Sequence, residues 1–155
     1  MGQRLKRAFA MIPPSVKTVA FRASIADLVE QRNPALAITL AFNRDTTPTA
    51  AAADLRHLHA RLDRMTLGHS WAKRTSQRTA SIAVIEHPTT NLHIHLALSC
   101  QPQFVARLQA EVPDIWAQMV PSGSVKVEPI FDALGWGRYI SKEITPGTAE
   151  LLLLS

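Results

Sequence analysis

The sequence contains a single cysteine, Cys100, and a single tyrosine, Tyr139, among 155 residues. One cysteine excludes an intrachain disulfide framework and a cysteine-rich zinc site. No apolar run approaches the roughly 20 residues that a membrane-spanning helix needs, so we expect no membrane partner and a cytoplasmic protein. A GxxxxGK[ST] phosphate loop is also absent, and nothing in these residues indicates an ATPase.

The composition that remains is that of an ordinary globular domain with an excess of basic residues. Hydrophobic residues make up 46% of the chain and charged residues 19%, which argues against a disordered protein. Lysine and arginine number 17 against 12 aspartates and glutamates, for a net charge of +5. A small basic domain is compatible with a polyanionic partner such as nucleic acid.

Residues 1–34 are expected to form a basic N-terminal extension with one helix over 15–31. The basic residues that precede the first acidic residue, Asp27, are Arg4, Lys6, Arg7, Lys17 and Arg22. They fit either a solvated tail or an arm that binds phosphates. Ser15 is a candidate helix cap. The apolar face of the helix is predicted at Val19, Ile25 and Leu28.

Residues 35–155 form the second unit, in which periodicity predicts the order strand, helix, strand, strand, helix, strand. The strands are expected at 35–42, 80–86, 91–98 and 125–131, and the helices at 49–66 and 102–119. This order is the ferredoxin-like or RRM-like βαββαβ pattern of an α+β fold with an antiparallel sheet. We expect both helices on one face of the sheet, leaving the other face open for a site.

Five local features refine this prediction. Pro113 predicts a break or kink in the second helix, and Pro129 indicates an edge strand. A short C-terminal helix over 132–143 follows, and residues 149–154 are expected to fold back onto the body. His57 and His59 lie two apart on the first helix, face different directions, and are expected to be solvated or partly packed.

The stretch 91–98 alternates apolar and polar residues, which places His93 and His95 on one face of a strand. The two imidazoles are then roughly 6–7 Å apart along the strand, a spacing that suits two ligands of one cation. If the turn spans 88–91, Glu86 pairs with His93 on the same face, whereas one residue more or less would turn Glu86 away. The sequence thus predicts a metal site of His93, His95 and Glu86, occupied by Mg²⁺ or Mn²⁺.

Tyr139 and Lys142 are three residues apart on the predicted helix 132–143 and so share a face. A tyrosine can attack phosphorus as a covalent nucleophile, and a neighbouring ammonium stabilises phenolate or phosphate charge. The alternative interpretation of Tyr139 is a half-buried structural residue.

These residues carry a resemblance to a known family. Leu92-His93-Ile94-His95-Leu96 resembles the His-hydrophobic-His motif of HUH endonucleases, and the segment 137–143 resembles the Tyr-x-x-Lys motif of their rolling-circle replication initiators, the Rep class. The segment 41–44 is loosely similar to that family's first motif. The resemblance covers about residues 35–145 and follows the family order.

The resemblance implies a metal-dependent endonuclease and strand transferase that acts on single-stranded or hairpin DNA, in rolling-circle replication or mobile-element processing. Tyr139 would attack the scissile phosphate and remain linked to the 5′ phosphate, and Lys142 would assist it. His93, His95 and Glu86 would hold the metal. With one tyrosine, the chain would be a single-tyrosine enzyme.

Residues expected to contact DNA lie at the end of the first strand, in a basic connector that also contains Trp71, and beside Tyr139. They are Asn43, Arg44, Lys73, Arg74, Arg78 and Arg138. Trp71 fits either base stacking or a packing anchor. Two other functions remain open: a non-catalytic module that binds single-stranded nucleic acid on the sheet, and a metal-dependent nuclease without a covalent step.

Overall fold

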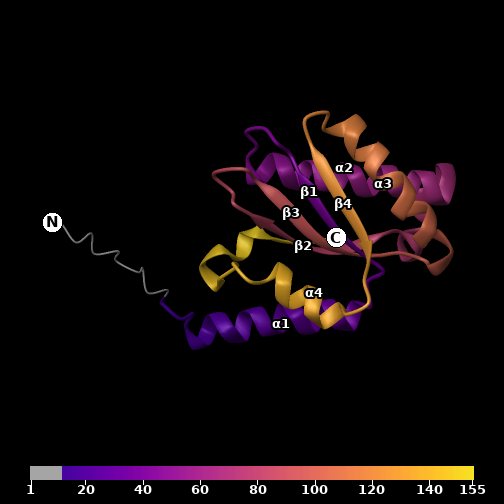
Figure 1. Ribbon diagram of the computed structural model, residues 1–155. Coiled ribbons are helices and arrows are strands. Elements are labelled where there is room, and N and C mark those ends of the chain that lie inside the picture. Colours follow the sequence, from indigo (N-terminus) through magenta and orange to yellow (C-terminus); the bar gives the residue numbers. More distant parts are fainter. Residues whose placement is uncertain (1–11) are drawn as a thin grey trace.

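The computed structural model describes residues 12–155 (Figure 1). The predicted basic residues Arg4, Lys6 and Arg7 lie outside the described residues. The helices are α1 (Val16–Arg32), α2 (Pro48–Leu67), α3 (Val105–Met119) and α4 (Ala133–Ile140). The strands are β1 (Leu36–Ala41), β2 (Ala80–Glu86), β3 (His93–Ser99), β4 (Ser124–Pro129) and β5 (Leu152–Leu154). The fold is therefore α+β, as expected.

The strands form one five-stranded sheet in the order β4-β1-β3-β2-β5. Every neighbouring pair is antiparallel, which confirms the antiparallel sheet. The prediction that β4 is an edge strand is confirmed. The C-terminal segment does fold back, but as a strand that sequence periodicity did not predict, because β5 pairs with residues 82–84 of β2.

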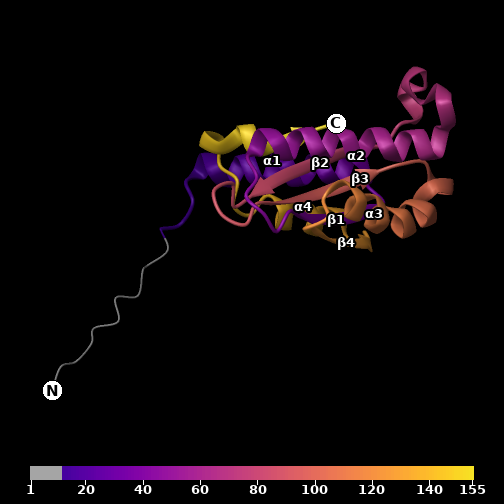
Figure 2. The ribbon, with the colours of Figure 1, turned by 90° about the horizontal axis from the view of Figure 1, so that it is seen from above.

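Alternation along the central strands sends one set of side chains into the main core. Leu36, Ile38 and Leu40 of β1 are fully buried, as are Ile94 and Leu96 of β3. They pack against apolar residues of α2 and α3, which cover this face of the sheet (Figures 1 and 2). Burial of large aliphatic side chains on both layers is the main source of stability here.

The expectation that the opposite sheet face is open was wrong. Ile25 and Val29 of α1 and Ile140 of α4 pack there against Val84 and Ala97 in a second apolar cluster. The helices α1 and α4 lie side by side below the sheet in Figure 1. The physical reason is that β2 and β3 also carry apolar residues on this face. The two helices bury these residues away from water.

Helix boundaries follow the capping residues. Ser15 accepts a hydrogen bond from the Thr18 backbone N–H at the start of α1, as predicted. The predicted face of that helix is wrong at Val19, which is 53% exposed, and Val29 is buried in its place. No break occurs at Pro113, which lies inside the continuous helix α3 beside the buried Val112.

Candidate active site

The hairpin of β2 and β3 brings the first three predicted site residues together. Glu86 is paired with His93, which confirms the predicted register, and Val84 is paired with His95. Alternation then places the side chains of Glu86, His93 and His95 on one face of the sheet. This is the face that α1 and α4 partly cover, so the site lies at the margin of the second apolar cluster.

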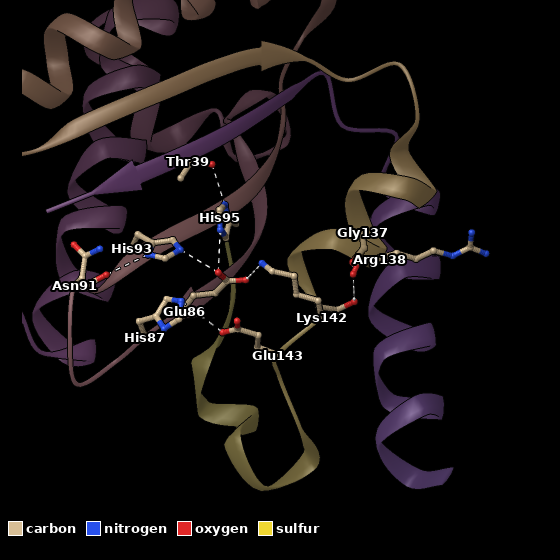
Figure 3. A network of polar contacts seen from close by, with 11 residues as sticks. Thr39, Glu86, His87, Asn91, His93, His95, Gly137, Arg138, Lys142 and Glu143 are labelled. Atoms are coloured by element: carbon tan, nitrogen blue, oxygen red, sulfur yellow. Dashed lines mark hydrogen bonds and ion pairs between the residues drawn. The ribbon is translucent and has the colours of Figure 1, made fainter. Parts of the chain in front are cut away.

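Both imidazoles converge on one carboxylate oxygen (Figure 3). The distance from Glu86 Oε2 to His93 Nε2 is 3.0 Å, and that to His95 Nε2 is 3.1 Å. The two rings meet edge to face with centroids 4.8 Å apart. Glu86 and His95 are buried, so these groups are held in one arrangement with little access to water.

Each imidazole faces Glu86 with Nε2 and makes a second hydrogen bond through Nδ1, on the other side of the ring. His93 Nδ1 lies 3.2 Å from the carbonyl oxygen of Asn91, which can only accept, so Nδ1 carries a proton. His93 Nε2 faces the Glu86 carboxylate, which only accepts, so this contact is favourable when Nε2 carries a proton or when a cation lies between the two atoms. His95 Nδ1 is hydrogen-bonded to Thr39 Oγ1 at 2.9 Å, and the hydroxyl can serve as donor or acceptor there. Outer partners of this kind orient the histidines that bind metals in proteins.

Lys142 reaches the same carboxylate from the opposite side (Figure 3). Its ammonium forms an ion pair with Glu86 Oε1. Burial raises the pKa of Glu86, but the hydrogen bonds and charges of His95 and Lys142 outweigh burial and lower that pKa to about 2. Glu86 is therefore an anion at neutral pH.

Tyr139 lies in α4 beside these groups and is 47% exposed. Its ring stacks on Trp136 with centroids 5.2 Å apart, and it meets the His95 ring edge to face at 5.3 Å. The Lys142 ammonium is 4.0 Å from the centre of the Tyr139 ring. The predicted helix 132–143 ends at Ile140, so Lys142 stands in the turn after α4 rather than on a shared helix face.

A cleft of about 310 Å³ opens beside the tyrosine. Its lining includes Thr39, His95, Lys126, Trp136 and Tyr139. The Trp136 indole N–H donates to the Leu96 carbonyl oxygen at 3.2 Å, which ties α4 to the sheet at this point. The cleft thus gives a ligand access to one histidine and the tyrosine together.

Sequence reasoning missed His87. Ligand atoms of Glu86, His87 and His93 lie within 4.8 Å of one another and could hold a metal ion. Strand alternation would direct His87 to the opposite face from Glu86, but its backbone φ of 51° leaves the extended conformation. Its Nε2 also lies 3.9 Å from Glu143 Oε2. The turn composition of 87–91 was the available signal, but it does not specify this backbone angle.

The residues expected to contact DNA are dispersed. Asn43 and Arg44 follow Ala41, which pairs with His93, so they leave the sheet at the end that carries the site. Asn43 Nδ2 donates to Ser124 Oγ at 3.3 Å, and Arg44 is paired with Asp54 at 3.9 Å.

Arg138 points away from Glu86 in Figure 3 although it adjoins Tyr139. Lys73, Arg74 and Arg78 come before Ala80, the first residue of β2, whereas Glu86 is its last. They therefore lie at the opposite end of that strand, about 20 Å away by the rise per residue.

In the part of the chain that the structure describes, no helix has the length and apolar character to cross a membrane. Comparison of the chain with protein-family models, with curated proteins and with solved structures found no match.

Proposed function

We propose that this chain is a metal-dependent endonuclease and strand transferase for single-stranded DNA, of the single-tyrosine HUH type. The observation that carries the proposal is the convergence of His93, His95 and Lys142 on Glu86, with the Tyr139 ring against His95. This arrangement brings a candidate cation site, a nucleophile and an ammonium side by side, and a cleft reaches its His95 and Tyr139.

We also infer that the core is the ferredoxin-like βαββαβ arrangement, with α4 added after it to carry the tyrosine. The strand order β4-β1-β3-β2, with α2 and α3 on one face, supports this inference. In such a core the two central strands offer paired positions for ligands, and here β1 and β3 contribute Thr39 and His95.

His93, His95 and Glu86 would hold the cation, with His87 as a further donor at the rim. Two imidazoles and one carboxylate leave coordination positions for a phosphate oxygen or water. Mg²⁺ or Mn²⁺ bound there would polarise the phosphoryl oxygen and stabilise the charge that develops in the transition state.

The covalent step is a transesterification. The Tyr139 oxygen attacks the scissile phosphorus, a phosphotyrosine ester forms, and the bond from phosphorus to the 3′ oxygen breaks. The phenol loses one proton and the 3′ oxygen gains one, so the protons balance. A 3′ hydroxyl is released and no further reactant is needed. Attack by a 3′ hydroxyl on the phosphotyrosine reverses the step and joins strands.

Residues around Tyr139 hold it for this step. Stacking on Trp136 and edge contact with His95 fix the ring plane. The Lys142 ammonium above the ring would stabilise the negative charge of the phosphate that Tyr139 attacks. Thr39 holds the His95 ring through Nδ1.

The test is incubation with end-labelled single-stranded and hairpin oligonucleotides plus Mn²⁺, followed by denaturing gel electrophoresis. We expect a labelled band at the mass of the protein, which the Tyr139→Phe variant does not form. His57→Ala, which removes an exposed histidine of α2, serves as the control and should form the band.

Two results would contradict the proposal. Cleavage that persists in Tyr139→Phe without an adduct would indicate a noncovalent metal-dependent nuclease, in which Tyr139 has only a packing role. Binding without cleavage in any member of the pool would favour a non-catalytic module that binds single-stranded nucleic acid.

A further inference from the structure

A second cavity lies far from the tyrosine, at the other end of β2. It has a volume of about 400 Å³, and Arg56, Trp71, Thr75 and Arg78 are among its lining residues. Arg78 precedes β2, and Glu86 ends it, so the two sites are about 20 Å apart along that strand. The cavity is therefore separate from the candidate active site around Glu86 and Tyr139.

The walls of this cavity come from α2 and the connector that follows it. Gly68 ends α2 with a φ of 74°, a left-handed angle that favours glycine, and the chain turns there into a short 3-10 segment, Gly68–Lys73. Trp71 lies in that segment and is only partly buried. The Arg74 guanidinium donates to the Leu67 carbonyl oxygen at 3.4 Å, which holds the connector against the end of α2.

The floor is a hydrogen-bond chain with defined directions. The Thr79 backbone N–H and hydroxyl both donate to Asp63 Oδ1, at 2.7 and 2.9 Å. The Thr79 hydroxyl therefore accepts from His59 Nδ1, 2.7 Å away, and His59 Nε2 is left to accept from the hydroxyls of Ser81 and Ser155, each at 2.9 Å. Burial lowers the pKa of His59 to about 4, so this histidine is neutral at physiological pH.

The rim is positive. Among residues 12–155, Arg56 and Arg78 have no carboxylate within ion-pair distance, and both side chains are exposed. The carboxyl groups in the lining are that of the Asp63 side chain, which is buried and turned to Thr79, and that of Ser155, the last residue of the sequence. Arg56 and Arg78 are thus exposed guanidinium groups that form no ion pair with the described residues, and such groups are available to an anion.

We propose that this cavity binds one nucleotide of single-stranded DNA, with the base stacked on Trp71 and a phosphate bound by Arg56 and Arg78. An indole face is a platform for any base, and arginine binds phosphate with paired donors. The cavity volume is in the range of small-molecule sites. That the nucleotide belongs to the strand cut at Tyr139 rests on the proposed function, whereas binding of a nucleotide here does not.

The first experiment uses thymidine 5′-monophosphate as the probe and the full chain as the protein. In ¹⁵N-resolved NMR spectra, the indole N–H signal missing in Trp71→Phe identifies Trp71. We expect this signal to shift and saturate as the nucleotide is added. The double variant Arg56→Ala/Arg78→Ala should abolish the shift, and Arg107→Ala, on the exposed face of α3, should keep it.

A Trp71 signal that does not shift when the nucleotide is added, or an equal shift in the double variant, would overturn the proposal. An equal shift with inorganic phosphate alone would also overturn it, because the cavity would then bind only an anion. Melting curves of each variant show whether it is folded, and Trp71→Phe, which keeps an aromatic face, should retain nucleotide binding by calorimetry.

The second experiment measures binding of a single-stranded oligonucleotide to Tyr139→Phe protein, which does not turn it over. Adding Trp71→Ala should weaken binding about tenfold or more, the usual loss when a stacking platform is removed. Adding Phe131→Ala, which removes an exposed aromatic outside the cavity, should not change it.

The two proposals fail separately. Nucleotide-dependent shifts of Trp71 in a protein that never cleaves DNA would keep the cavity and reject the nuclease. Cleavage of DNA by a protein whose Trp71 signal does not shift with nucleotide would keep the nuclease and reject the nucleotide site.

Discussion

At the scale of single residues, Glu86 is the centre of the candidate active site. One buried carboxylate faces two imidazoles through Oε2 and the Lys142 ammonium through Oε1. A bound cation and Lys142 would share its negative charge. Under the proposed function, metal affinity and the position of the ammonium beside Tyr139 would therefore be coupled through one side chain.

The ligand role of His93 is tested by its removal. Mn²⁺ is expected to raise the melting temperature of the protein, because a ligand that binds only the folded state stabilises it. His93→Ala should abolish the rise, and the exposed His57→Ala should keep it. The measurement is thermal unfolding with and without Mn²⁺, and a rise of equal size in His93→Ala would remove His93 from the ligand set.

Lys142 should oppose metal binding while supporting cleavage. Lys142→Met removes a cation next to Glu86, the carboxylate proposed to bind the metal, so Mn²⁺ affinity is expected to rise about fivefold or more, on the order of 1 kcal/mol. Cleavage should fall, since the ammonium above the Tyr139 ring is lost. Titration calorimetry and single-turnover cleavage measure the two effects.

The matched control is Lys126→Met in the same cleft, where the ammonium is paired with Glu128 at 3.3 Å instead. Weaker Mn²⁺ binding in Lys142→Met than in the wild type would contradict the expected competition.

At the scale of elements, the site has two parts on different supports. His93, His95 and Glu86 are placed by strands β2 and β3, whereas Tyr139 is placed by α4, which packs on α1. Gly137 is the close contact between the two helices. A Cβ atom added there would lie 2.8 Å from the Ala26 Cα, which is backbone and cannot rotate away.

Gly137→Ala should therefore separate the two parts of the site. We expect a lower melting temperature, because overpacking of about 1–3 kcal/mol exceeds the gain in helix propensity. Cleavage should fall because α4 moves with Tyr139, while Mn²⁺ affinity should stay unchanged. Gly147→Ala, where the nearest atom to the new Cβ is 3.7 Å away, should behave as the wild type. Unaltered melting and cleavage in Gly137→Ala would show that the α1–α4 contact does not position the tyrosine.

At the scale of the whole molecule, stability should depend on pH through His59. Its pKa is 6.5 in model compounds and about 4 in the folded protein, so the unfolded chain binds more protons between these values. The stabilising contribution is complete above about pH 6.5 and is lost as pH falls through about 4. The shift corresponds to about 3 kcal/mol.

His59→Gln should flatten this dependence. The difference in free energy of unfolding between wild type and variant should shrink from pH 7 to pH 4, as measured by denaturant titration at each pH. Parallel curves for the two proteins would mean that His59 does not supply the pH dependence.

The net charge of +5 acts at the same scale. Binding of single-stranded DNA should weaken steadily as salt concentration rises, because neutralised phosphates release counterions. Fluorescence anisotropy with a labelled oligonucleotide at several salt concentrations measures the slope. Affinity that does not change with salt would argue against a polyanionic partner.

The sequence by itself determined the local geometry of the site. Alternation over 91–98 put His93 and His95 on one face, whereas the pairing of Glu86 with His93 followed only for a turn at 88–91, a condition that the register of the hairpin meets. The helix start at Ser15 followed in the same way from a capping side chain. These features are readable because strand period, turn length and capping depend on residues that are close in the chain.

Only the tertiary structure decided which distant segments meet at the site. Three contacts join segments that no local pattern links. Lys142 forms an ion pair with Glu86, Thr39 is hydrogen-bonded to His95, and α1 packs on the second face of the sheet. The turn of His87 toward Glu86 depends on one backbone angle, and the distance of Arg78 from the site depends on the direction of β2. Such contacts arise from packing between elements, which periodicity along the chain does not encode.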